Sequence, residues 1–489
     1  MSGELVLCGL GPHARRIYYP RIESLVKAGA IRLRAVVELE SQKSSVEDYL
    51  AARQVRPQEI IYLPERARED PSSLPELLAG VDGYAARDAD ACVISTEPRS
   101  HRELALWALR NGMTVLLDKP VTARDLRHAD PREALRLYDD YLDISAAAAE
   151  AGRPVLVQTQ RRAHLGYELL MGYLQEFAGT WQVPITYVDI YHADGMWNMP
   201  DEYLFRENHP YKYGYGKLMH SGYHFVDLLT QILTVNAVVQ GQEVESLDVH
   251  LMEAGPVDHL SQLPSRFYDR VFGKDGSADA RGVFKLPEDL RGMGETDVLL
   301  TAQARNSNGA LVTSSVMSLL QTSFSRRAWP HLPADTYKGN GRVRHERVTV
   351  QVGPLLCVQV HSYQSYEARD WVGRGEGAGS YEHFDIDIYR NAELVGGRPF
   401  ERLALGDASQ MTGAQDGGYL GHNEAARHEL FGDFLRGDPT RAGLAHHRLP
   451  VQVLAASYYS LLSGRQGQPR DVRVTPAAAE WFSTTGRRT

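Results

Sequence analysis

The chain has 489 residues, of which 43% are hydrophobic and 24% charged, and its formal net charge at pH 7 is −9. This length predicts two or more domains with a sizeable core, and the composition is typical of an ordinary globular protein. The acidic balance gives no support for binding nucleic acid or an anionic membrane, and no run reaches the ~18 apolar residues that a membrane span needs. No signal peptide is visible, and the three scattered cysteines predict reduced thiols in a cytoplasmic protein.

The first apolar run begins at Leu5 and breaks at a Gly-x-Gly-x-x-Ala pattern, Gly9-Leu10-Gly11-Pro12-His13-Ala14. A strand followed by a tight glycine turn into a helix is what the pyrophosphate of a dinucleotide needs. Gly9 permits the turn, Gly11 lets the backbone approach the phosphates, and Ala14 lets the helix pack closely. The spacing alone is weak, but its position directly after the first strand strengthens it. We therefore expect a dinucleotide on Gly9, Gly11, Pro12, His13 and Ala14.

A second strand over residues 31–38 ends in Glu38, roughly 20 residues beyond the glycine loop, where an acid binds the adenosine ribose. Glu38 would accept hydrogen bonds from the ribose hydroxyls and repel a 2′-phosphate, so the expected cofactor is NAD. A solvated glutamate at a strand end is the alternative. Arg15, Arg16 and Lys43 lie close enough in sequence to keep NADP open.

Two further strands, 91–96 and 114–117, end in polar turns that would face the ligand crevice of a parallel sheet. The first turn predicts cofactor contacts from Ser95, Thr96, Glu97, Pro98 and His101. The second, Asp118-Lys119-Pro120, predicts cofactor contacts from Asp118 and Lys119 and would place the lysine ammonium in the crevice, although a strand-end lysine is usually just solvated. We expect residues 1–125 to form a doubly wound parallel sheet, with 42–90 covering the sheet or its edge. Residues 126–159 would connect onward through a helix and a strand.

The pattern changes after about residue 160 to the period-two alternation of antiparallel strands. Residues 297–304 and 310–319 flank an Asn-Gly turn and predict a hairpin. We expect residues 160–489 to form a second α/β domain with an open, mostly antiparallel sheet and helices on its other face. Residues 255–296 and 364–380 read as loops. The other strand-like runs in this half are 186–191, 347–352, 355–362 and 384–389.

The stretch from Lys217 to Leu229 carries two histidines four residues apart, His220 and His224, followed by Asp227. On a helix the two imidazoles share one face, where either could exchange a proton near neutral pH and Asp227 could orient His224. The same spacing suits two zinc ligands, so a metal enzyme is an alternative. Upstream, the aromatic run from Trp197 to Tyr215 suits a sugar ring and core packing about equally.

Together these motifs resemble the family of glucose-fructose oxidoreductase and inositol dehydrogenase (Gfo/Idh/MocA). The resemblance covers the first 120 residues motif by motif, returns at Gln160-Arg161-Arg162 and at 181–230, and continues more loosely through the C-terminal strands. Two departures stand out: Asp118 replaces the usual glutamate before Lys119, and His220 replaces the carboxylate that often assists the catalytic histidine.

The resemblance implies a Rossmann domain, NAD or NADP, and hydride transfer between nicotinamide and a hydroxyl or carbonyl carbon of a sugar, sugar derivative or cyclitol. Lys119 and His224 would face one another across a crevice near nicotinamide C4. Its implied catalytic residues are Lys119, His224 and His220, and its implied substrate contacts are Arg161, Trp197, Arg206, Tyr223 and Asp227.

The resemblance also implies a homo-oligomer, dimer or tetramer, formed through the open sheet, with no resident metal. Some relatives use tightly held NAD for transient oxidation, so a redox-neutral epimerisation, elimination or glycoside cleavage is the main alternative. A non-catalytic dinucleotide-binding sensor is the other.

Overall fold

The computed structural model describes residues 3–80, 88–198, 200, 202–276, 290–321, 343–365, 383–404 and 422–485. The chain forms two compact units. Unit 1 comprises residues 1–124, 136–164 and 423–451, and unit 2 comprises 125–135, 165–422 and 452–489. These units differ from the three consecutive segments that we expected, because residues 136–164 and 423–451 both belong to unit 1.

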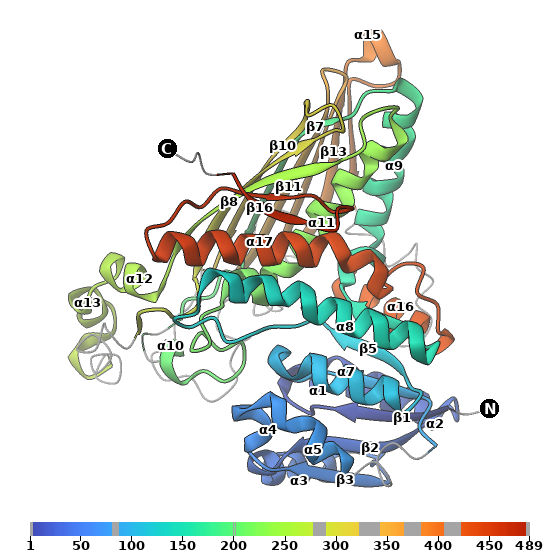
Figure 1. The fold of residues 1–489 in the computed structure, drawn as a ribbon, viewed down its shortest axis with the longest axis vertical. Coiled ribbons are helices and arrows are strands. Elements are labelled where there is room, and N and C mark those ends of the chain that lie inside the picture. Colours follow the sequence, from blue (N-terminus) through green and yellow to red (C-terminus); the bar gives the residue numbers. More distant parts are fainter. Residues whose placement is uncertain are drawn as a thin grey trace. The chain divides into compact units, whose positions relative to one another are not determined.

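The sheet of unit 1 contains six strands in the order β3-β2-β1-β4-β5-β6, and all the pairings are parallel (Figure 1). The strand order reverses between β1 and β4, which is where doubly wound sheets bind ligands. The expected Rossmann architecture is therefore confirmed. The strands are β1 (Gly3–Cys8), β2 (Ile31–Leu39), β3 (Glu59–Leu63), β4 (Ala91–Ile94), β5 (Thr114–Asp118) and β6 (Val155–Gln158).

The described helices of unit 1 from α1 to α8 lie in the connections between strands of its sheet, whereas α16 comes from the C-terminal part of the chain and has all but its first residue in unit 1. They are α1 (Pro12–Arg16), α2 (Tyr18–Lys27), α3 (Lys43–Ala51), α4 (Arg66–Glu69), α5 (Leu74–Ala79), α7 (His101–Arg110), α8 (Arg136–Ala151) and α16 (His422–Arg436). Helix α17 (Arg448–Arg465) begins in unit 1, and most of its residues belong to unit 2.

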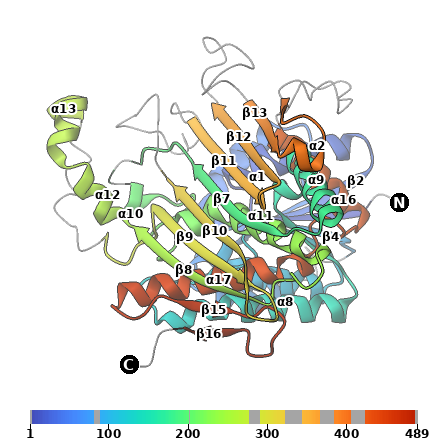
Figure 2. The same ribbon diagram turned by 90° about the horizontal axis from the view of Figure 1, so that it is seen from above.

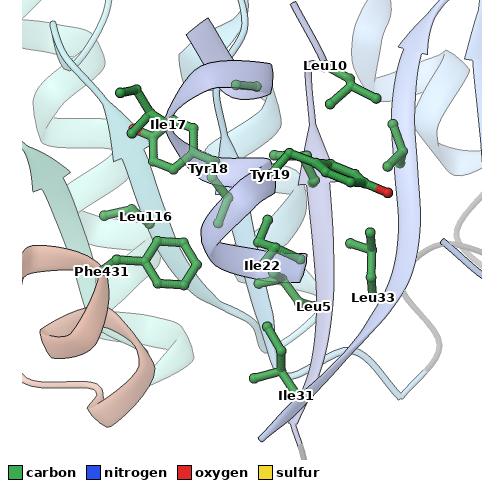
Figure 3. Packing of buried hydrophobic residues seen from close by; sticks show 14 of the residues in the cluster. Leu5, Leu10, Ile17, Tyr18, Tyr19, Ile22, Ile31, Leu33, Leu116 and Phe431 are labelled. Atoms are coloured by element: carbon green, nitrogen blue, oxygen red, sulfur yellow. The ribbon is translucent and has the colours of Figure 1, made fainter. Parts of the chain in front are cut away.

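The core of unit 1 explains why the C-terminal segment returns to this sheet (Figure 3). Tyr18, Tyr19 and Ile22 form the buried face of α2, and Phe431 of α16 packs against Tyr18 with 6.4 Å between ring centroids. Burying a phenylalanine side chain contributes roughly 1.5–3 kcal/mol, so Phe431 helps to hold α16 on this core.

Among the described residues of unit 2, ten strands form one sheet in the order β14-β13-β12-β11-β7-β10-β9-β8-β15-β16 (Figure 2). Strands β7 and β10 run parallel, whereas the other described pairings are antiparallel. The open, mostly antiparallel sheet is therefore confirmed. The strands are β7 (Ile185–Ala193), β8 (Ser246–Ala254), β9 (Asp297–Arg305), β10 (Leu311–Leu320), β11 (Val343–Val352), β12 (Leu356–Ser365), β13 (His383–Arg390), β14 (Phe400–Ala404), β15 (Val472–Val474) and β16 (Phe482–Thr484).

Helices α9, α11 and α17 lie on one face of this sheet (Figures 1 and 2). The hydroxyl oxygen of Ser460 in α17 accepts a hydrogen bond from the Leu251 amide of β8 at 3.0 Å, which ties that helix to the sheet. Within the described residues, no helix combines the length and apolarity that crossing a membrane requires. The helices are α9 (Leu165–Trp181), α10 (Glu202–Phe205), α11 (Tyr223–Thr234), α12 (Pro256–Gln262), α13 (Ser265–Gly276) and α15 (Ala392–Val395).

Some individual segments form as expected from the sequence, and others do not. The hairpin is confirmed, because the amide of Asn306 donates to Ala310 O at 3.0 Å and Gly309 adopts a φ of 76°. The prediction of a loop over 255–296 was wrong for the first part of this segment, where α12 and α13 form. Residues 42–90 also contain an unexpected strand, β3, which lies at the sheet edge and is only half-buried. Most of the loop expected at 364–380 lies outside the described residues.

Candidate active site

The glycine loop of unit 1 is shaped by a close backbone approach. Gly9 has a φ of 89°, and a Cβ atom added to it would lie 2.5 Å from the carbonyl oxygen of Ser95. No larger residue fits there. An added Cβ at Gly11 would meet no atom within 4 Å, so the backbone at this position faces open space. Ala14 is fully buried against the sheet. The loop thus offers the accessible backbone that a pyrophosphate requires.

Glu38 is fixed directly beside this loop by backbone amides. Its Oε2 accepts a hydrogen bond from Leu10 N at 2.7 Å, and its Oε1 accepts one from Leu39 N at 2.8 Å. Burial raises the pKa of Glu38, and the two amide hydrogen bonds act in the opposite direction. Each carboxylate oxygen can accept a second hydrogen bond, so the group remains able to bind a ribose diol.

His101 lies beneath the polar turns that follow β4 and β5. Its ring is fully buried, with Nδ1 2.9 Å from Pro120 O and Nε2 3.3 Å from Thr96 O. Burial lowers the pKa of His101 to about 4, so the ring is neutral at pH 7 and donates through one nitrogen only. The ring therefore lies between the two turns and donates a hydrogen bond to one of these two carbonyl oxygens, and the peptide bond between Lys119 and Pro120 within the second turn is cis.

The first of these turns is held together by local hydrogen bonds. Glu97 Oε2 accepts hydrogen bonds from the backbone amide of Arg99 at 3.2 Å and from its Nε at 3.0 Å. The hydroxyls of Thr96 and Ser100 lie 2.7 Å apart. Pro98 begins the 3₁₀ turn Pro98–Ser100, and Ser95 donates its amide to Cys8 O at 2.8 Å. The residues expected to contact the cofactor thus form one ordered rim at the ends of β1 and β4.

Asp118 connects the glycine loop to the Asp-Lys-Pro turn. Its Oδ2 lies 3.3 Å from Nε2 of His13, and its Oδ1 accepts a hydrogen bond from Lys119 N at 2.9 Å. Burial raises the pKa of Asp118, and the charge of Lys119 opposes that shift. The expected cofactor residues His13, Asp118 and Lys119 therefore lie together. Arg161, expected to bind substrate, is a buried residue of the 3₁₀ turn Gln160–Ala163, which follows β6 in unit 1.

In unit 2 the histidine segment begins with a π-helical turn, Leu218–Gly222, that continues as α11. Such turns insert an extra residue into a helix and occur often at functional sites. His220 and His224 are 7% and 6% exposed, so both reach the surface only at an edge. Tyr223 and Asp227 are fully buried, and Asp227 Oδ2 accepts a hydrogen bond from Gln231 Nε2 at 3.0 Å.

Three rings surround His220 nearly at right angles. The centroid distances are 4.9 Å to His209, 5.8 Å to Tyr215 and 5.9 Å to Tyr211. This arrangement fixes the imidazole plane, because each neighbour contacts it edge to face. His209 has a φ of 60°, a left-handed conformation that histidine adopts more readily than most residues.

The aromatic run from Trp197 to Tyr215 is divided between core and surface, and Phe205 within it is 74% exposed. Tyr203, Tyr211 and Tyr215 are buried. Arg206 Nη1 donates to Asn198 Oδ1 at 2.9 Å, and Asn198 Nδ2 donates to the hydroxyl of Tyr211 at 2.9 Å. Arg206 thereby supports the wall beside His220. Trp197 is half-buried and packs against Phe267, 5.7 Å away between ring centroids.

A buried polar cluster precedes the histidines, and our sequence analysis missed it. Lys217 is fully buried, and its Nζ lies 2.5 Å from Asp194 Oδ2 and 2.9 Å from both His192 Nδ1 and Ser221 Oγ. Because Lys217 donates to Nδ1, the neutral His192 carries its proton on Nε2. Asp194 follows a period-two strand in the sequence, which gave no signal that it would meet Lys217.

No group of three or more His, Cys, Asp or Glu side chains is arranged to hold a metal ion in the described part of the chain.

Comparisons with known proteins agree with this architecture. Residues 67–159 match the model of the GFO_IDH_MocA family, described as an oxidoreductase family with an NAD-binding Rossmann fold. The resemblance to that family is thus confirmed for this stretch. No curated protein sequence matches the chain significantly.

Solved structures share the fold across nearly the whole chain. The aldose-aldose oxidoreductase from Caulobacter crescentus, complexed with glycerol, is 16% identical, with a TM-score of 0.50 and coverage of 97% of this chain and 100% of that one. The WlbA dehydrogenase from Bordetella pertussis, in complex with NADH and UDP-GlcNAcA, is 17% identical, with a TM-score of 0.52 and 98% coverage of both chains. A levoglucosan dehydrogenase in complex with NADH and levoglucosan is 13% identical, with a TM-score of 0.53 and coverage of 98% of this chain and 100% of that one.

Proposed function

We propose that this protein is an NAD-dependent oxidoreductase that interconverts a hydroxyl and a carbonyl group of a sugar, sugar derivative or cyclitol. The observation that carries the proposal is the pairing of the open Gly9–Ala14 loop with Glu38, which is held against that loop by Leu10 N at 2.7 Å. The family match over residues 67–159 supports the same cofactor class.

The residues of unit 1 fit a dinucleotide. Gly11 leaves open space for a pyrophosphate, and the Glu38 carboxylate retains the lone pairs that a ribose diol needs. When bound, a nicotinamide ring would supply the two-electron redox chemistry. Glu38 favours NAD because a 2′-phosphate would place a second negative charge beside it.

Three residues are assigned to the handling of the substrate proton. His224 would take the proton from the substrate hydroxyl or return it to a carbonyl oxygen. Lys119 would donate a hydrogen bond to that oxygen and stabilise negative charge developing on it. His220, fixed by its ring of aromatic neighbours, would assist in place of the carboxylate common in the resembling family.

Support for a carbohydrate comes from the neighbours, whose solved complexes contain glycerol, levoglucosan and UDP-GlcNAcA. The proposed contacts from unit 2 are Trp197 and Arg206, while Arg161, Tyr223 and Asp227 are buried and would position other groups. A sugar offers adjacent hydroxyls that both donate and accept hydrogen bonds, which suits these mixed polar and aromatic side chains.

The test is to incubate the purified protein with NAD and a panel of aldoses, anhydro sugars, sugar nucleotides and cyclitols, and to follow NADH by absorbance. At least one compound should yield NADH in proportion to oxidised product. Product formation without NADH would instead favour the redox-neutral alternative, and neither product nor NADH across the panel would contradict a sugar oxidoreductase.

Variants then test the assigned roles. His224→Ala should lower kcat by ~10²–10⁴-fold with the affinity for NADH nearly unchanged, and Lys119→Ala should be comparably damaging. The matched controls are His250→Ala in β8 and Lys27→Ala at the end of α2, both partly exposed residues to which we assign no role in the reaction. Near-full turnover by His224→Ala would overturn the assignment.

A further inference from the structure

Glu295, two residues before β9, holds the first turn of the histidine segment from outside. Its side chain is fully buried, and its Oε1 accepts hydrogen bonds from Leu218 N at 2.8 Å and from the hydroxyl of Tyr458 at 2.9 Å. Leu218 begins the π-helical turn that contains His220, and Tyr458 belongs to α17. Oε1 of Glu295 thus links the start of the π-helical turn to α17 of the same unit.

The backbone around Glu295 is locked to the same segment. Lys217 N donates to Glu295 O at 2.8 Å. An added Cβ at Gly216 would lie 2.1 Å from Glu295 O, and one at Gly294 would lie 1.9 Å from Tyr215 O. The two chain segments therefore cross in contact at a pair of glycines, so a displacement of Glu295 must displace the residues just before His220.

The other carboxyl oxygen of Glu295, Oε2, is the one that would carry the proton in the neutral acid. Oε2 is buried and has no hydrogen-bond partner among the described residues. With two donors on Oε1, the proton of the neutral acid sits on Oε2. The pKa of Glu295 is raised to about 7, chiefly by burial and also by the charge of Glu253 in β8, while backbone hydrogen bonds, including the one from Leu218, and the charge of Arg465 in α17 act in the opposite direction.

Among the described residues, the cation that lowers the pKa of Glu295, Arg465, is already paired with another carboxylate. Arg465 is bound by Glu253, with Nε 2.7 Å from Oε1 and Nη2 2.8 Å from Oε2. Tyr458 is a buried phenol, and burial together with Glu295 raises its pKa well above the ordinary value, so it remains a donor. The neutral carboxylic acid of Glu295 can therefore accept hydrogen bonds from Leu218 N and the Tyr458 hydroxyl, so that no charge is buried at this position.

We propose that Glu295 and Tyr458 are positioning residues that set the placement of His220 and His224. The inference rests on the proposed function for its catalytic consequence. Neither residue touches a reacting atom. Both act through Leu218, which lies two residues before His220 and starts the helix that carries His224. Because a misplacement of ~1 Å can cost on the order of 10²-fold in rate, a loosened first turn should lower kcat without changing dinucleotide binding in unit 1.

Three variants and one control test the proposal in the full-length protein. Glu295→Ala removes the acceptor, Glu295→Gln retains a carbonyl oxygen at Oε1, and Tyr458→Phe removes one donor. The matched control is Ser460→Ala, which also deletes a hydroxyl of α17 but one that bonds Leu251 N of β8 at 3.0 Å instead of the histidine segment.

Two readouts separate a positioning role from a structural one. Amide hydrogen exchange of peptides covering 216–224 needs no substrate, and it should be faster in Glu295→Ala and Tyr458→Phe but unchanged in Glu295→Gln and Ser460→Ala. With a substrate found as above, kcat per folded molecule should fall ~10–100-fold in Glu295→Ala, recover to within ~3-fold in Glu295→Gln, and stay near wild type in Ser460→Ala.

The pH dependence of folding gives a third check. The pKa of Glu295 is raised to about 7 in the folded protein. Its contribution to the free energy of unfolding is therefore fully present below about pH 4.5 and is lost as the pH rises through 7. Glu295→Gln cannot titrate, so its stability should fall less than that of wild type over this range.

Unchanged exchange at 216–224 in both Glu295→Ala and Tyr458→Phe would overturn the proposal, as would an equal kcat in Glu295→Ala and Ser460→Ala. If Glu295→Ala fails to fold, the proposal is decided by comparing Tyr458→Phe with Ser460→Ala, using the same measurements of amide exchange and kcat. If no compound in the sugar panel is turned over, the proposed function fails, while the exchange experiment still decides whether Glu295 fixes the segment.

Discussion

Nζ of Lys217 lies 2.5 Å from Oδ2 of Asp194, and neither side chain is more than 5% exposed. This ion pair joins the residue that precedes the π-helical turn to the end of β7. Ser221, between His220 and Gly222, also donates to Asp194 Oδ2 at 2.6 Å. Lys217 and Glu295 thus restrain the same turn. Lys217 acts through its side chain, and Glu295 acts through its carboxyl group, which accepts from Leu218 N, and through its backbone carbonyl, which accepts from Lys217 N.

Lys217→Met should be severely destabilising, because it leaves the Asp194 carboxylate buried without its cation. Breaking a buried pair on one side typically costs about 3–5 kcal/mol. The control is Lys212→Met, since Lys212 pairs with the exposed Glu207 and such surface pairs contribute roughly 0–1 kcal/mol. Urea denaturation of both variants measures the difference, and equal losses would show that the Lys217 pair is not a significant source of stability.

Glu38→Gln should narrow the preference for NADH over NADPH and weaken NADH binding. The amide would present its NH₂ group to either Leu10 N or Leu39 N, so one backbone donor loses its acceptor. Arg15 donates to Leu10 O at 2.8 Å and Arg16 pairs with Glu424 at 3.2 Å, so both cations have protein partners already.

Fluorescence titration of NADH and NADPH measures these affinities. Glu40→Gln, an exposed change two residues further along the chain, is the control and should leave both affinities unchanged. Tighter binding of NADPH than of NADH by the wild-type protein would contradict the role of Glu38.

His101 should make the folded protein less stable in acid. Its pKa is about 4 in the folded state and about 6.5 when unfolded, so between these values the unfolded chain binds more protons. The stabilisation is therefore present above pH 6.5 and is lost as the pH falls toward 4, by up to about 3 kcal/mol for the full shift. Denaturant unfolding at pH 7.5, 6 and 5 should show that the free energy of unfolding declines less steeply with falling pH in His101→Asn than in wild type. Parallel curves would mean that His101 titrates normally.

The sequence predicted the first sheet well, because each of its strands except β3 is a short apolar run with a distinct break after it. Gly9, Glu38 and the turns after β4 and β5 carry local patterns whose spacing reflects backbone geometry. The edge strand β3 is only half-buried, so its residues lack the continuous apolar character of the inner strands.

The supporting contacts could not be predicted, because they depend on pairings between residues distant in sequence. Lys217 and Asp194 are separated by 23 positions, and Leu218 and Glu295 by 77. A glutamate between Gly294 and Thr296 resembles any polar residue before a strand. The position of His101 after the β4 turn predicted that it would lie near the cofactor site, but nothing in the sequence predicted that its ring would be fully buried. The return of α16 to unit 1 depends on Phe431, whose partner Tyr18 lies at the other end of the chain.

Self-association should use the face of the large sheet opposite α9, α11 and α17. Met252 of β8 and Leu299 of β9 are paired neighbours, and they remain 42% and 37% exposed. Exposed apolar neighbours on a sheet often mark an interface. Light scattering should give a dimer or larger oligomer at micromolar concentration. The double variant Met252→Glu with Leu299→Glu should shift it toward monomer, whereas Leu142→Glu, an equally exposed change in α8, should not. A strictly monomeric wild-type protein would contradict this prediction.

His220→Ala should lower kcat by about 10²-fold or more if His220 has taken over the proton-handling role of the carboxylate that it replaces. Because His209, Tyr211 and Tyr215 enclose the ring, part of any loss could come from the cavity left by alanine. His220→Phe separates the two effects, since it fills the space but cannot exchange a proton. A large loss in both variants assigns the proton role to the imidazole, whereas near-normal kcat in His220→Phe would make His220 a packing residue and leave His224 alone to transfer the proton.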